Sequence, residues 1–184
     1  CYQIAKTKKR MSFETAKKIV NRLFDDDNGK SEAIILEFIG GEPLLEIDLI
    51  DKIIDYFLYQ GTIRNHRWAT YFMISICSNG VAYFEPKVQE FIKKHHKHLS
   101  FGISIDGCKE LHDACRKDIN GNGSYEQAFK AYKASLKDLN AEPGTKVTIA
   151  PENLPYLDKI LDFFIDSGST IIHANPIYEH EWTC

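Results

Sequence analysis

Apolar residues along the chain follow two alternating patterns, short uninterrupted runs and longer segments in which they recur at helical spacing. Short runs bounded by turn residues are typical of buried strands, and recurrence at every third or fourth position is typical of a helix with one buried face. Strands are therefore predicted at residues 33–39, 71–76, 99–105, 146–150 and 170–176. Helices are predicted at residues 12–24, 50–58, 86–97, 124–139 and 153–165.

Polar residues and glycines set the expected helix ends. Ser124 and Gln127 have the spacing of a capping box, and Asn153 stands where an N-cap residue would begin the last helix. Gly61 and Gly168 follow the second and the last helix, where glycine commonly ends a helix.

Alternation of strands and helices defines the fold class as α/β. Consecutive strands joined by helical crossovers must run parallel. The pattern is consistent with an open doubly wound sheet and with a whole or partial α/β barrel, and periodicity alone does not separate them.

Composition narrows the class of protein further. The 184 residues are 43% hydrophobic, which suffices for one core and one domain. Lys+Arg number 23 against 26 Asp+Glu, so the net charge of -3 offers no basic field for nucleic acid. No apolar stretch approaches the roughly 18 to 20 residues of a membrane span, so we expect a cytoplasmic protein without a membrane partner. The five cysteines are widely scattered, which favours reduced thiols over a disulfide framework.

Unusual residues gather where the predicted strands end. Parallel α/β folds bind ligands outside the carboxyl ends of their strands, because the loops there vary while the layers beneath stay packed. These ends read Gly40-Gly41-Glu42-Pro43, Ser78-Asn79-Gly80, Asp106-Gly107, Pro151-Glu152-Asn153 and Asn175-Pro176. Each dipeptide alone is ordinary turn chemistry, but their placement at successive strand ends favours a binding site.

The residue types indicate the ligand chemistry. Gly40 and Gly41 let the backbone approach a ligand closely, and the Glu42 carboxylate suits an ammonium group. Short hydroxyl, amide and carboxylate groups of the kind that hold ribose hydroxyls or an amino-acid head group come from Ser78, Asn79, Ser104 and Asp106. The sequence therefore predicts a zwitterionic or nucleoside-like ligand.

Two other groups of residues admit simpler interpretations. Arg116 can pair with a ligand carboxylate in bidentate fashion, or it can form a surface ion pair. His95, His96 and His98 have no acidic or cysteine ligands nearby in the sequence, so we expect a solvated helix end rather than a metal site.

Several loops follow one another in an order that resembles an enzyme family. "GGEP" at 40–43 follows one strand and "SNG" at 78–80 the next, and "SIDG" at 104–107 precedes "HDACR" at 112–116 and "GNGSYEQA" at 121–128. This series resembles the radical S-adenosylmethionine (radical SAM) enzymes, in the branch of anaerobic sulfatase-maturating enzymes and SPASM-type peptide maturases. The resemblance covers almost the whole chain.

The resemblance implies a role for the first residue. In that family a CxxxCxxC motif follows the first barrel strand and binds a [4Fe-4S] cluster, and the opening "CYQ" resembles the end of that motif. Cys1 would then be a cluster ligand, with its two partner cysteines and the first strand upstream. The fold implied is a partial (β/α)6 TIM-like barrel of the radical SAM type that lacks its first strand in this chain. Residues 1–184 would form one truncated core domain, and a C-terminal extension would start at 177–184.

The resemblance also implies cofactors and partners. Gly40, Gly41 and Glu42 would hold the methionyl ammonium of S-adenosyl-L-methionine. Its ribose and carboxylate would contact Ser78, Asn79, Ser104, Asp106 and Arg116. The cluster and this cofactor would generate a 5′-deoxyadenosyl radical that takes hydrogen from a peptide or protein, with electrons from an external flavodoxin or ferredoxin.

Two alternatives stay open at this point. One is an iron-free α/β-barrel isomerase or lyase that uses Glu42 or Asp106 as a general base. The other is a scaffold that only binds, because the single thiolate of Cys1 cannot hold a cluster tightly. The resemblance implies that these 184 residues alone do not turn over substrate.

Overall fold

One parallel sheet organises the protein. The computed structural model describes residues 10–27, 29–118, 120–140 and 143–177. The strands are β1 (Ile34–Phe38), β2 (Phe72–Ser78), β3 (Leu99–Ser104), β4 (Gly144–Ile149) and β5 (Ile172–Pro176). The α-helices are α1 (Phe13–Asp27), α2 (Ile47–Ile63), α3 (Pro86–His95), α4 (Lys109–Cys115), α5 (Tyr125–Asp138) and α6 (Leu157–Asp166). Short 3₁₀ turns η1 (Pro43–Glu46), η2 (Arg67–Ala69) and η3 (Leu154–Tyr156) precede α2, β2 and α6.

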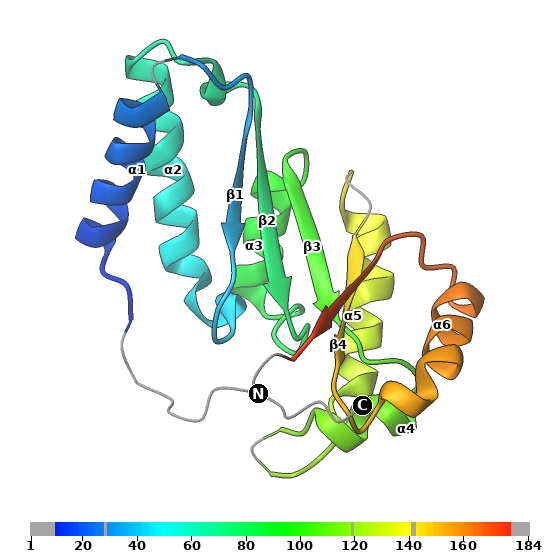
Figure 1. Cartoon of the computed structure of the whole chain (residues 1–184). Helices are drawn as coiled ribbons and strands as arrows, with labels where there is room; N and C mark the ends of the chain where they lie inside the picture. The colour runs from blue at the N-terminus through cyan, green and yellow to red at the C-terminus, as the bar shows by residue number, and fades with distance from the viewer. Residues whose placement is uncertain (1–9, 28, 119, 141–142, 178–184) are drawn as a thin grey trace.

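The strand order distinguishes between the two architectures left open by the sequence. The order is β1-β2-β3-β4-β5, and each neighbouring pair is parallel. A doubly wound sheet reverses its order part-way and carries helices on both faces. In the part of the chain that the structure describes, the order never reverses, and Figure 1 shows the helices outside a curved sheet in which β5 is strongly inclined to β1. The fold is therefore a partial TIM-like α/β barrel, as the resemblance implied.

The two faces of the sheet differ in burial because side chains alternate along each strand. Beneath the helices lie the buried residues Ile74, Ile76, Leu99, Phe101, Ile103 and Val147. The opposite face, here called the inner face, carries Ile35, Glu37, Met73, Ser75, Cys77, Ser100, Gly102, Ser104, Lys146 and Thr148. The core thus occupies the outer side, and the inner face keeps more polar and exposed side chains.

The predicted elements are confirmed, with strand ends that differ by at most two residues. The main-chain N–H of Thr15 donates to Ser12 Oγ at 3.1 Å, so Ser12 begins α1 as expected. Gly61 does not end α2, which continues to Ile63. A Cβ on Gly61 would lie 3.2 Å from Ala69, so this glycine serves a close approach inside the helix.

Two predicted caps are wrong. Ser124 makes no capping bond to α5, and the Tyr125 N–H donates instead to the Asp113 carboxylate of α4 at 2.9 Å. Asn153 does not cap α6, because its side chain bonds the Ala150 N–H and the Thr148 carbonyl, both behind it in the chain. Helix α4, which supplies Asp113, has no counterpart among the predicted helices.

Among the described residues, no helix combines the length and the apolar character that crossing a membrane requires.

Candidate functional site at the carboxyl ends of the strands

The loop after β1 presents one carboxylate in a fixed position. Gly40 has a φ of +105°, a conformation that glycine adopts without strain, and Glu42 begins the η1 turn. Glu42 Oε1 accepts hydrogen bonds from Ser78 Oγ at 2.7 Å and from the Leu44 N–H at 3.2 Å. Glu42 Oε2 accepts one from the Asn79 N–H at 2.9 Å. The structure thus brings Glu42, Ser78 and Asn79 together from two loops, as their positions at strand ends predicted.

The bonding of Glu42 leaves room for one more donor. A carboxylate offers about four lone-pair positions, two on each oxygen. Oε1 uses two and Oε2 uses one within the described residues, so one position on Oε2 is open. A Cβ added to Gly40 or Gly41 would meet nothing within 4 Å, so space adjoins this loop. An ammonium group fits both the free lone pair and the space.

Ser78 acts inside the protein rather than at its surface. Its side chain is buried, and its hydroxyl donates to Glu42 while accepting the Gly80 N–H at 2.9 Å. The Asn79 side-chain oxygen accepts the Val81 N–H at 2.9 Å, which closes a local turn. Ser78 therefore orients Glu42, and the Asn79 amide nitrogen keeps its donor capacity.

A buried ion pair joins the ends of β3 and β4. Arg116 Nε lies 2.5 Å from Asp106 Oδ2, and Arg116 Nη2 donates to Asp106 Oδ1 at 3.2 Å and to Thr148 Oγ1 at 3.0 Å. The Thr148 N–H also donates to Asp106 Oδ1, at 2.8 Å. The Asp106 side chain is 3% exposed and that of Arg116 27%. Arg116 does bind a carboxylate in bidentate fashion, and that carboxylate belongs to the protein itself.

Ser104 differs from the other predicted site residues. It lies at the end of β3 on the inner face, opposite Lys146 of β4. Within the described residues its hydroxyl forms no hydrogen bond, so it is available to a ligand.

A second polar cluster, formed by Glu37, Cys77 and Lys146, lies on the inner face of the sheet, before the strands end. Lys146 Nζ is 3.6 Å from Glu37 Oε1, and Cys77 Sγ is 3.8 Å from the same oxygen. A Cβ on Gly102 would lie 3.2 Å from Lys146 Cε, so the lysine crosses the sheet where β3 has no side chain. Burial lowers the pKa of Lys146, but Cys77 and the Glu37 charge outweigh it and raise the pKa overall.

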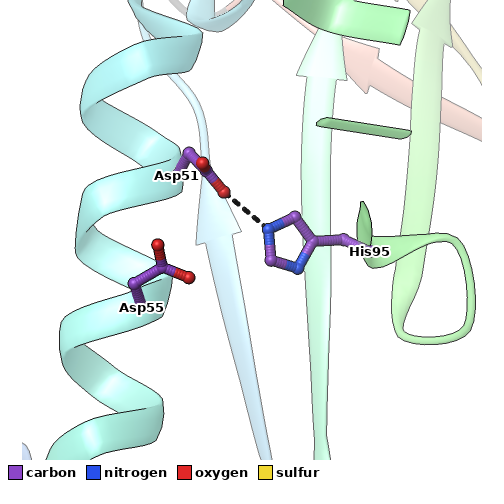
Figure 2. A group of neighbouring side chains, drawn as sticks. All are labelled: Asp51, Asp55 and His95. Atoms are coloured by element: carbon purple, nitrogen blue, oxygen red, sulfur yellow. Dashed lines mark hydrogen bonds and ion pairs between the residues drawn. The ribbon is translucent and has the colours of Figure 1, made fainter. Parts of the chain in front are cut away.

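The histidine-rich end of α3 is not solvated as predicted. His95 is 6% exposed, and its Nε2 lies 2.7 Å from Asp51 Oδ1 on α2, as Figure 2 shows. His98 stacks on Phe72 with ring centroids 4.3 Å apart. The prediction is wrong for these two because their partners are distant in sequence. His96 is half-buried, and its Nδ1 lies 3.0 Å from the Lys93 carbonyl oxygen.

Asp51, Asp55 and His95 form the one group of three metal-ligating side chains found in the described part of the chain. Figure 2 shows the two carboxylates one helical turn apart on α2, with His95 facing Asp51. The Lys94 ammonium already lies 2.9 Å from Asp51 Oδ1 and 2.7 Å from Asp55 Oδ1. The Lys94 ammonium thus lies between the two carboxylates that a metal ion would need, and these ion pairs join α3 to α2.

Sequence reasoning did not assign a role to His112, which lies next to the site. His112 is fully buried, its Nδ1 accepts the Asp106 N–H at 3.3 Å, and its Nε2 lies 3.0 Å from Ser124 Oγ. His112 lies in α4 and Arg116 is the residue just after its end, and the four-residue spacing between them is the signal that they lie close together. Cys1 and residues 178–184 lie outside the described residues, so the predicted cluster ligand keeps the status of a prediction.

The half-barrel and the polar strand ends together define a TIM-like α/β protein with a candidate ligand site at the carboxyl edge of its sheet. No protein-family model matches the chain. Over 168 residues the chain is 35% identical to an uncharacterized protein of Methanocaldococcus jannaschii, covering 91% of this chain and 54% of that protein. Over 157 residues it is 31% identical to a cysteine-type anaerobic sulfatase-maturating enzyme of Clostridium novyi, covering 84% of this chain and 38% of that enzyme. The chain therefore spans about half or less of the length of these curated relatives.

A solved structure and a further sequence relative add to the comparison. The solved structure of native anSMEcpe with bound AdoMet and Kp18Cys peptide matches with a TM-score of 0.77 and 21% identity, covering all of this chain and 49% of that one. The radical SAM cyclopropyl synthase TigE of Paramaledivibacter caminithermalis is 23% identical over 147 residues, which cover 79% of this chain and 28% of that enzyme. The predicted resemblance to the radical SAM enzymes, in the sulfatase-maturase branch, is confirmed.

Proposed function

We propose that this chain is the S-adenosylmethionine-binding core of a radical enzyme that modifies a peptide or protein. The observation that carries the proposal is the Glu42 carboxylate, which three protein donors hold in place while one acceptor position stays open and the adjoining Gly40 and Gly41 leave space beside the loop. A preorganised carboxylate of this kind binds an ammonium group without the entropy loss of ordering its own side chain.

The surrounding residues divide the remaining contacts. Ser104 and Arg116 have unused donors that would bind the carboxylate of the methionyl group, and the Asn79 amide suits a ribose hydroxyl. Asp106 holds Arg116 in place through its buried ion pair. With both bound, a [4Fe-4S] cluster and S-adenosylmethionine supply a 5′-deoxyadenosyl radical for hydrogen abstraction. Cys1 would contribute one thiolate to that cluster.

The geometry disfavours an iron-free alternative that uses Asp106 as its general base. A general base needs a free lone pair directed at the substrate proton. Both Asp106 oxygens are bonded to Arg116, and one also accepts the Thr148 N–H in a buried setting. Three donors occupy Glu42. Asp106 is therefore not placed as a free base, whereas Glu42 keeps one open acceptor position.

The solved structure with a bound peptide supports a peptide or protein substrate. An electron donor of the flavodoxin or ferredoxin type is part of the proposal. Thioether formation and oxidation of a cysteine or serine to formylglycine are both compatible with the residues of this chain.

Binding of S-adenosylmethionine by the whole protein, reconstituted with iron and sulfide without oxygen, tests the proposal. A Glu42→Gln substitution removes a charge-assisted hydrogen bond of about 1.5–3 kcal/mol, so binding should weaken roughly 10- to 150-fold. Glu46→Gln is the matched control, because Glu46 lies in the same turn and pairs with Arg10. Thermal unfolding of each variant checks that the fold is kept.

Dithionite reduction with S-adenosylmethionine should then yield 5′-deoxyadenosine, and a Cys1→Ala substitution should abolish it. A cluster-loaded protein that binds no S-adenosylmethionine would sink the proposal, as would a Glu42→Gln variant that binds like the wild type.

A further inference from the structure

A directed chain of hydrogen bonds links His112 to the residues around Arg116. The main-chain N–H of Asp106 can only donate, so His112 Nδ1, 3.3 Å away, is the acceptor and carries no proton. The ring proton of the neutral imidazole therefore lies on Nε2 and is donated to Ser124 Oγ at 3.0 Å. The Ser124 hydroxyl in turn donates to the Arg116 carbonyl at 3.3 Å.

This chain closes a ring with the ion pair described above. Asp106 lies two residues after the end of β3, and Arg116 lies ten residues later, just after α4. The imidazole and the Ser124 hydroxyl connect the Asp106 main chain to the Arg116 main chain, and the carboxylate connects to the guanidinium. Arg116 is thus fixed at its backbone and its side chain relative to the end of β3.

The fixed guanidinium keeps one nitrogen without a partner. Nε and Nη2 donate to Asp106 and Thr148, and within the described residues Nη1 has no hydrogen bond. The side chain is 27% exposed at the carboxyl edge of the sheet, next to Thr148 of β4. Because Nε and Nη2 are both hydrogen-bonded, the guanidinium cannot rotate, and the N–H groups of Nη1 point in a fixed direction.

We infer that His112 and Ser124 are positioning residues that aim the free Arg116 nitrogen at the carboxylate of the bound ligand. The inference rests on the proposed function, in which that ligand is S-adenosylmethionine. The hydrogen bonds of His112 require a neutral imidazole. Burial lowers the pKa of His112, the charges of Arg116 and Lys109 lower it further, and the charges of Asp106 and Asp113 oppose this shift.

Two ligands that differ in one group test the inference. S-adenosylmethionine carries the carboxylate, and decarboxylated S-adenosylmethionine lacks it, so the difference in their affinities reports the carboxylate contact. In the whole protein, His112→Asn keeps an acceptor for the Asp106 N–H but is too short to reach Ser124, and Ser124→Ala breaks the same link from the other side. Each should weaken binding of S-adenosylmethionine roughly 3- to 10-fold and leave the decarboxylated analogue within about twofold. The double variant should be no worse than either single variant.

A matched control and a spectroscopic reading make the test independent of stability. His98→Asn changes a histidine that bonds the Phe72 carbonyl at the opposite edge of the sheet, and it should alter neither affinity. Nitrogen-15 spectra of the imidazoles should show His112 neutral, with its proton on Nε2.

The outcomes separate the inference from the proposed function. Equal weakening of both ligands in the two variants, or a proton on Nδ1 of His112, would overturn the inference alone. A wild-type protein that binds neither ligand would overturn the proposed function and the inference with it.

Discussion

Removal of the Arg116 side chain should show how much the Asp106 pair contributes to folding. In an Arg116→Met variant the Asp106 carboxylate, 3% exposed, stays buried and keeps only the Thr148 N–H as a donor. Breaking a buried ion pair in this way costs about 3–5 kcal/mol. Because Arg116 is itself 27% exposed, water can enter its place, so we expect a loss near the lower limit, about 3 kcal/mol.

Asp106→Asn should be milder. The amide oxygen can still accept the Thr148 N–H, and the unpaired guanidinium can turn toward solvent, so a loss of about 1–2 kcal/mol is expected. The double variant should be no less stable than Arg116→Met, which corresponds to a coupling energy of about 1–2 kcal/mol.

Urea unfolding followed by far-ultraviolet circular dichroism measures these differences without any ligand. With a slope of about 2 kcal/mol per molar urea, Arg116→Met should lower the midpoint by about 1.5 M. Arg22→Met is the control, because it removes an arginine that pairs with Asp26 on the exposed face of α1, and its midpoint should not move. Losses that simply add in the double variant would refute the reasoning, since independent residues do not couple.

Three further predictions concern packing and pH. Gly123→Ala should destabilise the fold by about 1–2 kcal/mol in urea titrations, because its Cβ would lie 2.0 Å from the Asp113 carboxylate that caps α5, and an unchanged midpoint would contradict this. The lowered pKa of His112 means that, as the pH falls below about 6.5, the unfolded chain takes up a proton at this residue before the folded protein does. The free energy of unfolding should therefore fall by at most about 1.4 kcal/mol per pH unit through His112. His112→Gln should flatten that part of the pH profile, and an unaltered slope would argue against the assignment. Ile54→Ala should cost about 2–5 kcal/mol because Ile54 is 0% exposed, whereas Ile165→Ala, at a position 69% exposed, should change stability by less than about 0.5 kcal/mol; comparable losses would contradict the placement of the core.

Much of the fold was predictable because strands and helices leave periodic apolar patterns that depend on neighbouring residues alone. The strand-end residues were also predictable, since parallel strands bring their carboxyl ends to one edge whatever the helices between them do. Glu42, Ser78 and Asn79 meet there for that reason.

What the sequence did not reveal depends on partners far apart in the chain. The Tyr125 N–H finds its cap on Asp113, and His95 finds Asp51 forty-four residues away. Local spacing cannot indicate such pairs. The predicted capping box and the predicted solvated helix end were wrong because contacts between separate elements took the place of the local ones. The pairing of Asp106 with Arg116 is of the same kind, because a short unpredicted helix brings them together.

The Lys146 side chain, which passes over Gly102, joins two distant strands of the curved sheet. Lys146 starts on the fourth strand of the sheet and reaches a carboxylate on the first, two strands that share no main-chain hydrogen bonds. A parallel sheet has no local turn that sets its bend, so a side chain that joins distant strands on the concave side helps to hold its curvature. A larger residue in place of Gly102 would displace the Lys146 side chain from Glu37. The sheet would then lose a side-chain contact that helps to hold its curvature on the concave side.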